Sequence, residues 1–293
     1  MDNFLSDLYQ YIAEDAIFDW QAGDIPTCPI PNFTPAMAAN RTYFDRSEWA
    51  KGYFEACHRD EAFEGCWRAA TGSWDDKIVV DIGCDPGNLY ATLGGSPRLL
   101  IGVDISRNAL EMARKIGYTP ILADAHNLPF IDNFADIVTL NATIHHCEDM
   151  PQVLAEAARL VRPGGLLITD HDPQHTAWNF LGVGMLLYKI RVPIYRLMIG
   201  DSFMTKEEHT AMIASEIHHQ PGKGVKPDLY YQTLEPLGFT VQLYPHNHTV
   251  GSEVLQGNYG RSDDKYRFGQ WLSGINPNSK TAALSLMCVA KRN

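Results

Sequence analysis

The chain has 293 residues, of which 45% are hydrophobic and 20% charged, so its composition is that of a globular protein rather than a disordered or collagen-like one. Acidic residues outnumber Lys and Arg by 35 to 24, and the net charge of -11 disfavours proteins that bind nucleic acid through its phosphates. The N-terminus lacks the basic segment of a signal peptide, and no apolar stretch reaches the ~18 residues of a membrane span. We therefore expect a cytoplasmic protein that does not span a membrane and has no nucleic-acid partner.

The first 75 residues differ in pattern from the rest of the chain. They are rich in aromatic side chains and contain a proline-rich break at 26–35, which predicts an N-terminal helical cap segment over 1–75. From Lys77 onward, short apolar runs alternate with helical patterns. This alternation is typical of parallel strands joined by crossover helices.

Five apolar runs predict parallel strands, and two later runs predict a hairpin-like pair. They lie at 77–82, 99–104, 120–123, 136–141, 166–169, 239–244 and 282–290. Ser106 can cap a helix that ends near Gly117. Pro151 begins another helix, and a turn at 162–165 follows it. The fold class is therefore α/β, with a doubly wound, mostly parallel, seven-stranded sheet.

Two insertions fit neither a strand nor a crossover helix. The first, 174–225, predicts an inserted lid after the first half of the core at 76–173. The second, 247–279, interrupts the C-terminal part of the core at 226–293. With the N-terminal segment, they would form a helical cap. Its most apolar part, 177–199, could line a pocket for a lipophilic ligand, lie on a membrane surface, or pack as a helix pair on the sheet or on a second subunit.

The first predicted strand runs into the loop 81–88, with the sequence DIGCDPGN. In open α/β sheets, ligands bind beyond the carboxyl ends of the strands. A dinucleotide fingerprint would need glycine at the positions of Gly83, Asp85 and Asn88, and only the first is glycine, so NAD and FAD are disfavoured. A P-loop is also absent, because no Lys-Ser/Thr pair follows the glycines.

This loop resembles the first motif, acid-x-Gly-x-Gly-x-Gly, of class I S-adenosylmethionine (SAM)-dependent methyltransferases. Four further family motifs follow in the family's order. They are Asp104, Asp124-Ala125-x-x-Leu128-Pro129-Phe130, Asn141-Ala142-Thr143-Ile144-His145-His146-x-x-Asp149, and Leu160-Val161-Arg162-Pro163-Gly164-Gly165. The resemblance covers about 76–171 well and 226–291 in outline, and it points to the small-molecule branch that includes quinone-biosynthesis enzymes. It implies a Rossmann-like fold and SAM as the cofactor, with S-adenosylhomocysteine (SAH) as the product.

The resemblance also implies which residues bind the cofactor. Asp104 would accept hydrogen bonds from both ribose hydroxyls, Asp124 would accept one from the adenine amino group, and Asn141 would lie near the methionine carboxylate. Helix capping is the alternative for Asp104, and a turn carboxylate is the alternative for Asp124. The full set is Tyr43, Asp81, Gly83, Asp85, Gly87, Asp104, Ile105, Asp124, Ala125 and Asn141.

Asp85 departs from the family motif, because it stands where the middle glycine is expected. Aspartate tolerates a positive φ better than most residues, so the sequence still predicts the turn. Its carboxylate would either pair with the ammonium group of the cofactor or lie solvated in the turn.

Catalysis by such a protein depends mainly on alignment of the acceptor with the methyl group. A base is needed only if the acceptor must lose a proton. The candidate residues are His145, His146, His219 and His246, and structural support of the loops is the alternative for them. Asp170, His171, Asp172 and His175 have spacing that could hold a metal, but a polar turn is the simpler interpretation, so we predict no metal site.

The predicted activity is methyl transfer to O, N or C of a small, largely apolar or aromatic metabolite. Two alternatives stay open: a catalytically idle or regulatory SAM-binding module, and a SAM enzyme with different chemistry on the same fold. The expected partner is a small-molecule acceptor, and self-association into a homo-oligomer is an open alternative to a monomer.

Overall fold

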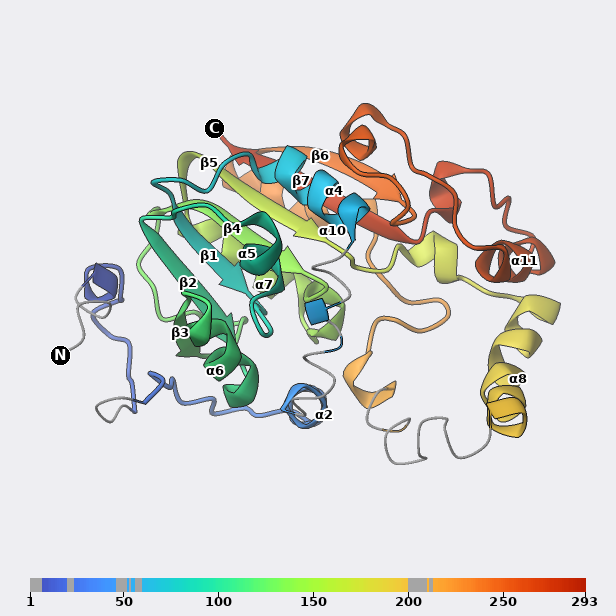
Figure 1. Ribbon diagram of the computed structural model, residues 1–293, viewed down its shortest axis with the longest axis horizontal. Helices are drawn as coiled ribbons and strands as arrows, with labels where there is room; N and C mark the ends of the chain where they lie inside the picture. The colour runs from blue at the N-terminus through green and yellow to red at the C-terminus, as the bar shows by residue number, and fades with distance from the viewer. Residues whose placement is uncertain are drawn as a thin grey trace.

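The computed structural model describes residues 7–19, 24–45, 52, 54–55, 60–199, 210 and 213–293. Its centre is a seven-stranded sheet with the strand order β3-β2-β1-β4-β5-β7-β6 (Figure 1). The strands are β1 (Ile78–Ile82), β2 (Leu99–Asp104), β3 (Thr119–Leu122), β4 (Ala135–Asn141), β5 (Val161–Asp170), β6 (Phe239–His246) and β7 (Ser285–Arg292). Strands β1 to β5 pair in parallel, and β7 pairs antiparallel with both β5 and β6. The predicted fold class, with its late hairpin-like pair, is confirmed.

Helices cover both faces of this sheet. One core cluster packs α4 (Glu61–Thr71), α5 (Asn88–Leu93) and α6 (Arg107–Lys115) against one face. A second cluster packs α7 (Met150–Leu160) and α10 (Pro227–Leu234) against the other. Along β1, Ile78, Val80 and Ile82 belong to the second cluster, while Val79 belongs to the first. Because both faces of β1 are buried, its sequence is continuously apolar up to Asp81.

Local capping signals position the helices as predicted. The hydroxyl of Ser106 accepts a hydrogen bond from the backbone N–H of Ala109 at 3.2 Å, and α6 ends at Lys115, two residues before Gly117. Asp149 caps α7, which carries a proline in its first turn. These caps satisfy backbone N–H groups that a helix start leaves without partners.

The structure corrects the predicted turn at 162–165, because these residues lie inside β5. The register between β4 and β5 shifts there: Ala135 pairs with Val161, whereas Ile137 pairs with Leu166. The extra residues form a bulge, in which a Cβ on Gly165 would lie 2.9 Å from the carbonyl oxygen of Asp136. Glycine therefore permits the close approach of the two strands.

The last predicted strand begins later than expected, at Ser285 rather than Ala282. A 3-10 turn, η6 (Lys280–Ala282), precedes it. The other 3-10 segments are η1 (Ile144–His146), η2 (His175–Trp178), η4 (Glu235–Leu237) and η5 (Ser252–Gln256).

Inserted segments form the cap. Helices α8 (Gly182–Ile199) and α11 (Asp264–Leu272) contact each other and lie at the opposite end of the molecule from β3 (Figure 1). A Cβ on Gly184 would lie 2.6 Å from the carbonyl oxygen of Gly269, so the absence of a side chain at Gly184 allows this contact. Among the described helices, none combines the length and hydropathy needed to cross a bilayer.

Helix α2 (Pro35–Phe44) is attached to the core at both ends. At its start, Thr34 caps the helix and its hydroxyl donates a hydrogen bond to Glu148. At its end, Asp45 accepts a hydrogen bond from the hydroxyl of Ser106 at 2.7 Å. Since Glu148 follows β4 and Ser106 follows β2, α2 bridges the carboxyl ends of these strands.

Replacement of Leu154 by Ala tests the core under α7. Leu154 is fully buried, so we expect the free energy of unfolding to fall by about 2–5 kcal/mol, through lost burial and the cavity left behind. Denaturant titration followed by circular dichroism measures this. The matched control is Leu237→Ala, at a residue 44% exposed, for which we expect a change within about 0.5 kcal/mol. Equal losses in the two variants would contradict the assigned core.

Candidate functional site

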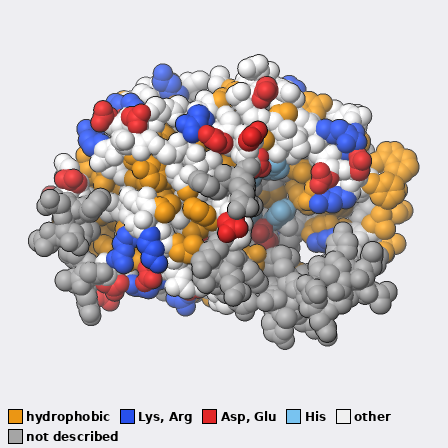
Figure 2. Space-filling view, viewed as in Figure 1, with side chains coloured by type: hydrophobic (Ala, Val, Ile, Leu, Met, Phe, Trp, Pro, Cys, Tyr) orange, Lys and Arg blue, Asp and Glu red, His pale blue; other side chains and the backbone are white. Residues whose placement is uncertain are grey.

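A cavity of about 380 Å³ lies at the carboxyl ends of β1, β2 and β4 and is bordered by α2 and by residues Glu216 and His219 of the first insertion. Its volume falls in the range of small-molecule sites. Figure 2 shows histidine and acidic side chains set back from the surface near the middle of one face. The predicted residues that line the cavity are Tyr43, Asp81, Gly83, Asp85, Asp104, Ile105, Asp124, Ala125, Asn141, His145, His146 and His219.

The loop after β1 has a series of left-handed residues. Gly83, Asp85 and Gly87 have φ values of +66°, +51° and +94°. The positive φ of Asp85 confirms that aspartate can replace the expected glycine in this turn. Backbone N–H groups of Gly83 and Cys84 donate to the carbonyl oxygen of Val103 at 2.8 and 3.1 Å, so the loop is attached to β2.

The two glycines of this loop serve packing. A Cβ on Gly83 would lie 2.4 Å from the hydroxyl oxygen of Thr143, so glycine lets the loop approach the end of β4. A Cβ on Gly87 would lie 2.6 Å from the side chain of Ile116. Gly87, which the resemblance assigns to the cofactor site, does not line the cavity.

Asp104 combines the two interpretations that the sequence left open. One carboxylate oxygen, Oδ1, accepts a hydrogen bond from the backbone N–H of Ser106 at 2.8 Å, at the start of α6. The other, Oδ2, accepts one from the backbone N–H of Asp85 at 3.0 Å. Each oxygen has a second lone pair, and the residue lines the cavity. A carboxylate held by backbone groups can therefore also accept from a bound ligand.

Asp81 is almost fully buried beneath this loop. Its carboxylate accepts hydrogen bonds from the hydroxyls of Tyr118 and Thr139, both at 2.8 Å. Burial raises the pKa of Asp81 to about 7, although the two hydrogen bonds act in the opposite direction. The residue therefore links β1 to β4 and to the start of β3. When it is ionised, it also adds a negative charge to the cavity wall.

Carboxylates dominate the charge of this end of the cavity. Burial, followed by repulsion from Asp104 and Asp81, raises the pKa of Asp85 well above its ordinary value. Burial also raises the pKa of Asp104. Among the lining residues, which all lie in the described part of the chain, there is no Lys or Arg. The cavity therefore favours a cationic ligand, which would stabilise the ionised carboxylates.

Asp124 has a different environment, at the end of β3. Its Oδ1 lies 2.7 Å from Nδ1 of His126 and accepts the backbone N–H of the same residue at 2.9 Å. Burial alone would raise the pKa of Asp124, but the hydrogen bonds from His126 lower it overall. Asp124 therefore presents an ionised acceptor to the cavity. His126 was not among the predicted residues.

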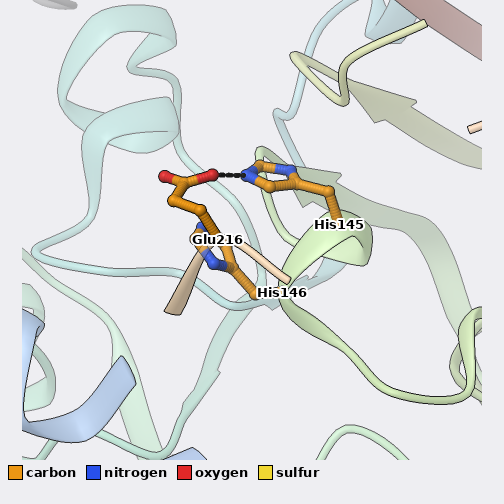
Figure 3. A group of neighbouring side chains, drawn as sticks. All are labelled: His145, His146 and Glu216. Carbon is orange, nitrogen blue, oxygen red and sulfur yellow. Dashed lines mark ion pairs between the residues drawn. The ribbon is translucent and has the colours of Figure 1, made fainter. Parts of the chain in front are cut away.

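His145, His146 and Glu216 lie together at another part of the cavity wall (Figure 3). Nε2 of His145 is 3.2 Å from Oε2 of Glu216, and Nδ1 is 2.8 Å from Oδ1 of Asp172. Burial would lower the pKa of His145, but hydrogen bonds to Asp172 and Glu216 raise it to about 9. Burial and the adjacent His145 lower the pKa of His146 to about 4.

Glu216 also contacts His219, whose Nδ1 is 3.2 Å from Oε2. Burial would raise the pKa of Glu216, yet hydrogen bonds to His145 and His219 hold it far below its ordinary value. Two residues of the first insertion, Glu216 and His219, therefore line the cavity. Its apolar part does not contribute, because none of the described side chains of 177–191 lines the cavity.

Aromatic residues of α2 complete the wall. Tyr43 and Phe44 line the cavity, and the ring of Phe44 lies edge-on to His146, with centroids 5.8 Å apart. Burial, followed by the carboxylates of Glu216 and Asp85, raises the pKa of Tyr43. Tyr43 therefore lies near both acidic groups, between the loop after β1 and the first insertion.

The remaining histidine candidate lies elsewhere. His246 ends β6, is 1% exposed, and its Nε2 is 2.6 Å from Oδ1 of Asp170. Unlike the other three histidine candidates, it does not line the cavity, which removes the geometric basis for a role as a base there. The four candidates at the end of β5 do not converge on one point. Asp170 contacts both His246 and His171, whereas Asp172 contacts His145 and His175 begins η2.

Sequence reasoning missed Glu216, Thr143 and His126 as parts of the site. Thr143 lies within a recognised motif, so its position in the sequence could have pointed to it. Asp172 was considered only as part of a possible metal group with Asp170, His171 and His175, and not as a partner of His145. Glu216 lies in an insertion and is followed closely by His218 and His219, but no periodic pattern places that segment over the sheet.

Residues 80–169 match the family model of a methyltransferase domain. The chain is 29% identical over 162 residues to demethylmenaquinone methyltransferase of Staphylococcus epidermidis, covering 53% of this chain and 66% of that protein. It is 35% identical over 105 residues to the protein of the same name from Corynebacterium kroppenstedtii, covering 34% of this chain and 46% of that protein. The chain thus spans less than two thirds of the length of these curated relatives.

Among solved structures, magnesium protoporphyrin IX methyltransferase of Synechocystis PCC 6803 has a TM-score of 0.49 and 16% identity, covering 87% of this chain and 99% of that chain. The domain match and the ordered motifs identify the class. Within the chain, residues 80–169 carry the features of a methyltransferase domain of the class I, SAM-dependent type. SAM is the cofactor of this class.

The cavity residues fit this cofactor. Oδ1 of Asp85 and both polar atoms of the Asn88 side chain are buried without a hydrogen-bond partner in the described part of the chain. Both residues line the cavity, so a ligand with ammonium and carboxylate groups would supply the missing partners. SAM also carries a sulfonium charge, which suits a wall rich in carboxylates.

The raised pKa values of the cavity carboxylates predict that SAM binding depends on pH. The pKa of Asp81 is raised to about 7, so this carboxyl is partly protonated near pH 7, and the pKa of Asp85 is raised as well. A cationic ligand lowers both pKa values. We therefore expect SAM binding to release protons, and affinity to rise from about pH 6 to about pH 7.5, where the amino group of SAM is still mostly charged. Calorimetry in buffers of different ionisation enthalpy measures the release. In Asp85→Asn, fewer protons should be released, and an unchanged release would refute the assignment.

Proposed function

We propose that the chain transfers the methyl group of SAM to a small acceptor molecule. The observation that carries the proposal is a set of carboxylates around one cavity, at the ends of neighbouring strands. Asp81 lies near the end of β1 and Asp85 in the loop after it, Asp104 ends β2, and Asp124 follows β3. Such a series offers acceptors to the ammonium, ribose and adenine groups of a single extended cation.

In this arrangement Asp104 binds the ribose hydroxyls and Asp124 accepts from the adenine amino group. Ile105 and Ala125 follow these two residues directly and flank the adenine ring. Asp85 and Asn141 lie toward the methionine end. Support comes from the positions of all six residues in the cavity wall, and from the backbone hydrogen bonds that hold the carboxylate of Asp104 at the end of β2.

When bound, the sulfonium supplies an activated methyl group and a neutral leaving group. The chain's own contribution is placement, since a well-aligned nucleophile accounts for much of the rate of such a displacement. Tyr43 and Phe44 of α2 cover the cavity and limit the access of water. His145, His146 and His219 face the same cavity and are the residues that we assign to contact with the acceptor.

The acceptor that we propose is a small molecule with an aromatic or quinone-like ring, methylated at O, N or C. Phe44 and Tyr43 offer ring faces and edges, while the neighbouring histidines and Glu216 offer polar contacts. The curated relatives are named demethylmenaquinone methyltransferases, which agrees with a ring acceptor. The absence of Lys and Arg from the described cavity wall is unfavourable for a nucleic-acid acceptor. Cytoplasmic location and homo-oligomer formation stay predictions.

Calorimetric titration with SAH tests the cofactor site. We expect Asp104→Asn to bind SAH about 10–100-fold more weakly, because hydrogen bonds to a charged group contribute about 1.5–3 kcal/mol. The control is Asp132→Asn, at a carboxylate 60% exposed and remote from the cavity lining, which should bind as the parent does. Parent-like affinity in Asp104→Asn would contradict the ribose assignment.

Transfer itself is tested with SAM that carries a labelled methyl group and a panel of hydroxylated aromatic and quinone acceptors. Label in an acceptor supports the proposal. If the parent chain binds SAH but labels no acceptor of any class, the regulatory alternative is favoured. If SAH does not bind at millimolar concentration, the proposal is wrong.

A further inference from the structure

We propose that His145, His146 and Glu216 bind a divalent transition-metal ion in the wall of the cavity. Each residue offers one ligand atom, and these three atoms lie within 4.8 Å of one another. Figure 3 shows the carboxylate of Glu216 directed toward the ring of His145, with His146 beside it. The inference revises the sequence-based expectation that the chain has no metal site.

Distances in this group fit a metal centre. Around an ion with ligand bonds of about 2.0–2.1 Å, tetrahedral ligand atoms lie about 3.3 Å apart. Nε2 of His145 and Oε2 of Glu216 are already 3.2 Å apart. Small rotations of His146 toward this pair would bring the third atom to a comparable separation.

Both imidazole rings are oriented as metal ligands are. Nδ1 of His145 lies 2.8 Å from the fully buried carboxylate of Asp172, which also accepts the backbone N–H of His145 at 3.0 Å. Nδ1 of His146 lies 2.8 Å from the carbonyl oxygen of Ser215 and must donate to it. Carboxylate and carbonyl partners of this kind fix the ring and leave Nε2 for a metal.

The backbone brings these residues together from two distant parts of the chain. Ala142 has a φ of +53°, and the 3-10 turn η1 follows, which places the adjacent rings of His145 and His146 with centroids 4.1 Å apart. Glu216 comes from the first insertion, which is held to this turn by a hydrogen bond of 3.1 Å from the N–H of His218 to the carbonyl oxygen of His145. The insertion therefore contributes a ligand as well as a border.

Two imidazoles and one carboxylate suit zinc, iron(II), cobalt or nickel better than magnesium or calcium, which prefer oxygen ligands. Three protein ligands leave coordination positions open toward the cavity. The next step rests on the proposed function: an oxygen or nitrogen atom of the acceptor would occupy one of the open coordination positions. The ion would lower the pKa of a bound hydroxyl, whose proton passes to solvent before the oxygen attacks the methyl carbon and the carbon–sulfur bond breaks.

Direct metal binding tests this inference on the full chain without any acceptor. After treatment with a chelator, the protein is titrated with Co²⁺ and followed by its visible absorption, and Zn²⁺ is then used to displace the Co²⁺. We expect one ion per chain. Glu216→Gln and His146→Gln should each bind Co²⁺ at least about 100-fold more weakly. Asp172→Asn, at a positioning residue, should lose about 10–100-fold.

The matched control is His175→Gln, because His175 lies in η2 and outside the cavity lining. It should bind Co²⁺ as the parent does. Thermal unfolding and SAH titration of each variant show whether the fold and the cofactor site persist. His146→Gln, at a partly exposed residue, is the variant to use if Asp172→Asn does not fold.

Parent protein that binds no Co²⁺ or Zn²⁺ at micromolar concentration would overturn the inference, as would equal affinity in the parent and in Glu216→Gln. SAH binding is measured separately in the presence of chelator. If SAH binds and metal does not, only the metal site is wrong. If metal binds and SAH does not, the metal site stands and the proposed function falls.

Discussion

Repulsion among buried carboxylates is the constraint on which this site depends. Asp81, Asp85 and Asp104 lie around one strand-end loop, and burial raises the pKa of each. The fold tolerates this because hydroxyl and backbone donors satisfy Asp81 and Asp104. Asp85 keeps one buried oxygen without a partner in the described part of the chain. The folded protein thus keeps an unfavourable electrostatic free energy at this loop, which a cationic ligand would lower. Ionisable groups with shifted pKa values are common at functional sites.

The same carboxylates link the sheet to its loops. Asp81 is held by hydroxyls from two other segments, and Asp104 is held by the loop that follows β1 and by the start of α6. A shift of one strand end would therefore also displace the neighbouring strand ends and loops. This explains why a non-glycine residue at Asp85 is compatible with a well-defined turn: its N–H is bonded to Asp104, and its φ is that of the left-handed region.

Much of the fold could be predicted because the first half of the sequence leaves few alternatives. A continuously apolar run such as 78–80 is typical of a strand buried on both faces, as in a parallel sheet covered by helices. The caps at Ser106 and Asp149 limit the helices that follow. The bulge at 162–165 was mistaken for a turn, because Pro and Gly indicate a break without showing whether strand pairing resumes. The left-handed turn at Asp85 was predicted from the tolerance of that residue type.

The site was predictable where it follows strand ends and less so where it depends on insertions. Asp104 and Asp124 follow strands, and strand ends of a parallel sheet meet at one edge. His246 also ends a strand, but β6 lies at the far edge of the sheet, so its side chain contacts Asp170 instead. Glu216 was missed because the path of an insertion depends on tertiary contacts, here the hydrogen bond between His218 and His145. Such contacts produce no periodic pattern in the sequence.

The scarcity of basic side chains around the cavity has a consequence for metabolite selection. With no Lys or Arg in the described wall, which carries Asp85, Asp104, Asp124 and Glu216, compounds bearing phosphate or sulfate groups meet mainly carboxylates there. Abundant cellular anions such as nucleotides are therefore poor competitors for the pocket. This electrostatic repulsion acts together with the glycine pattern of the loop after β1. The glycine pattern is unfavourable for pyrophosphate because of the loop geometry, and the carboxylates are unfavourable for it because of their charge.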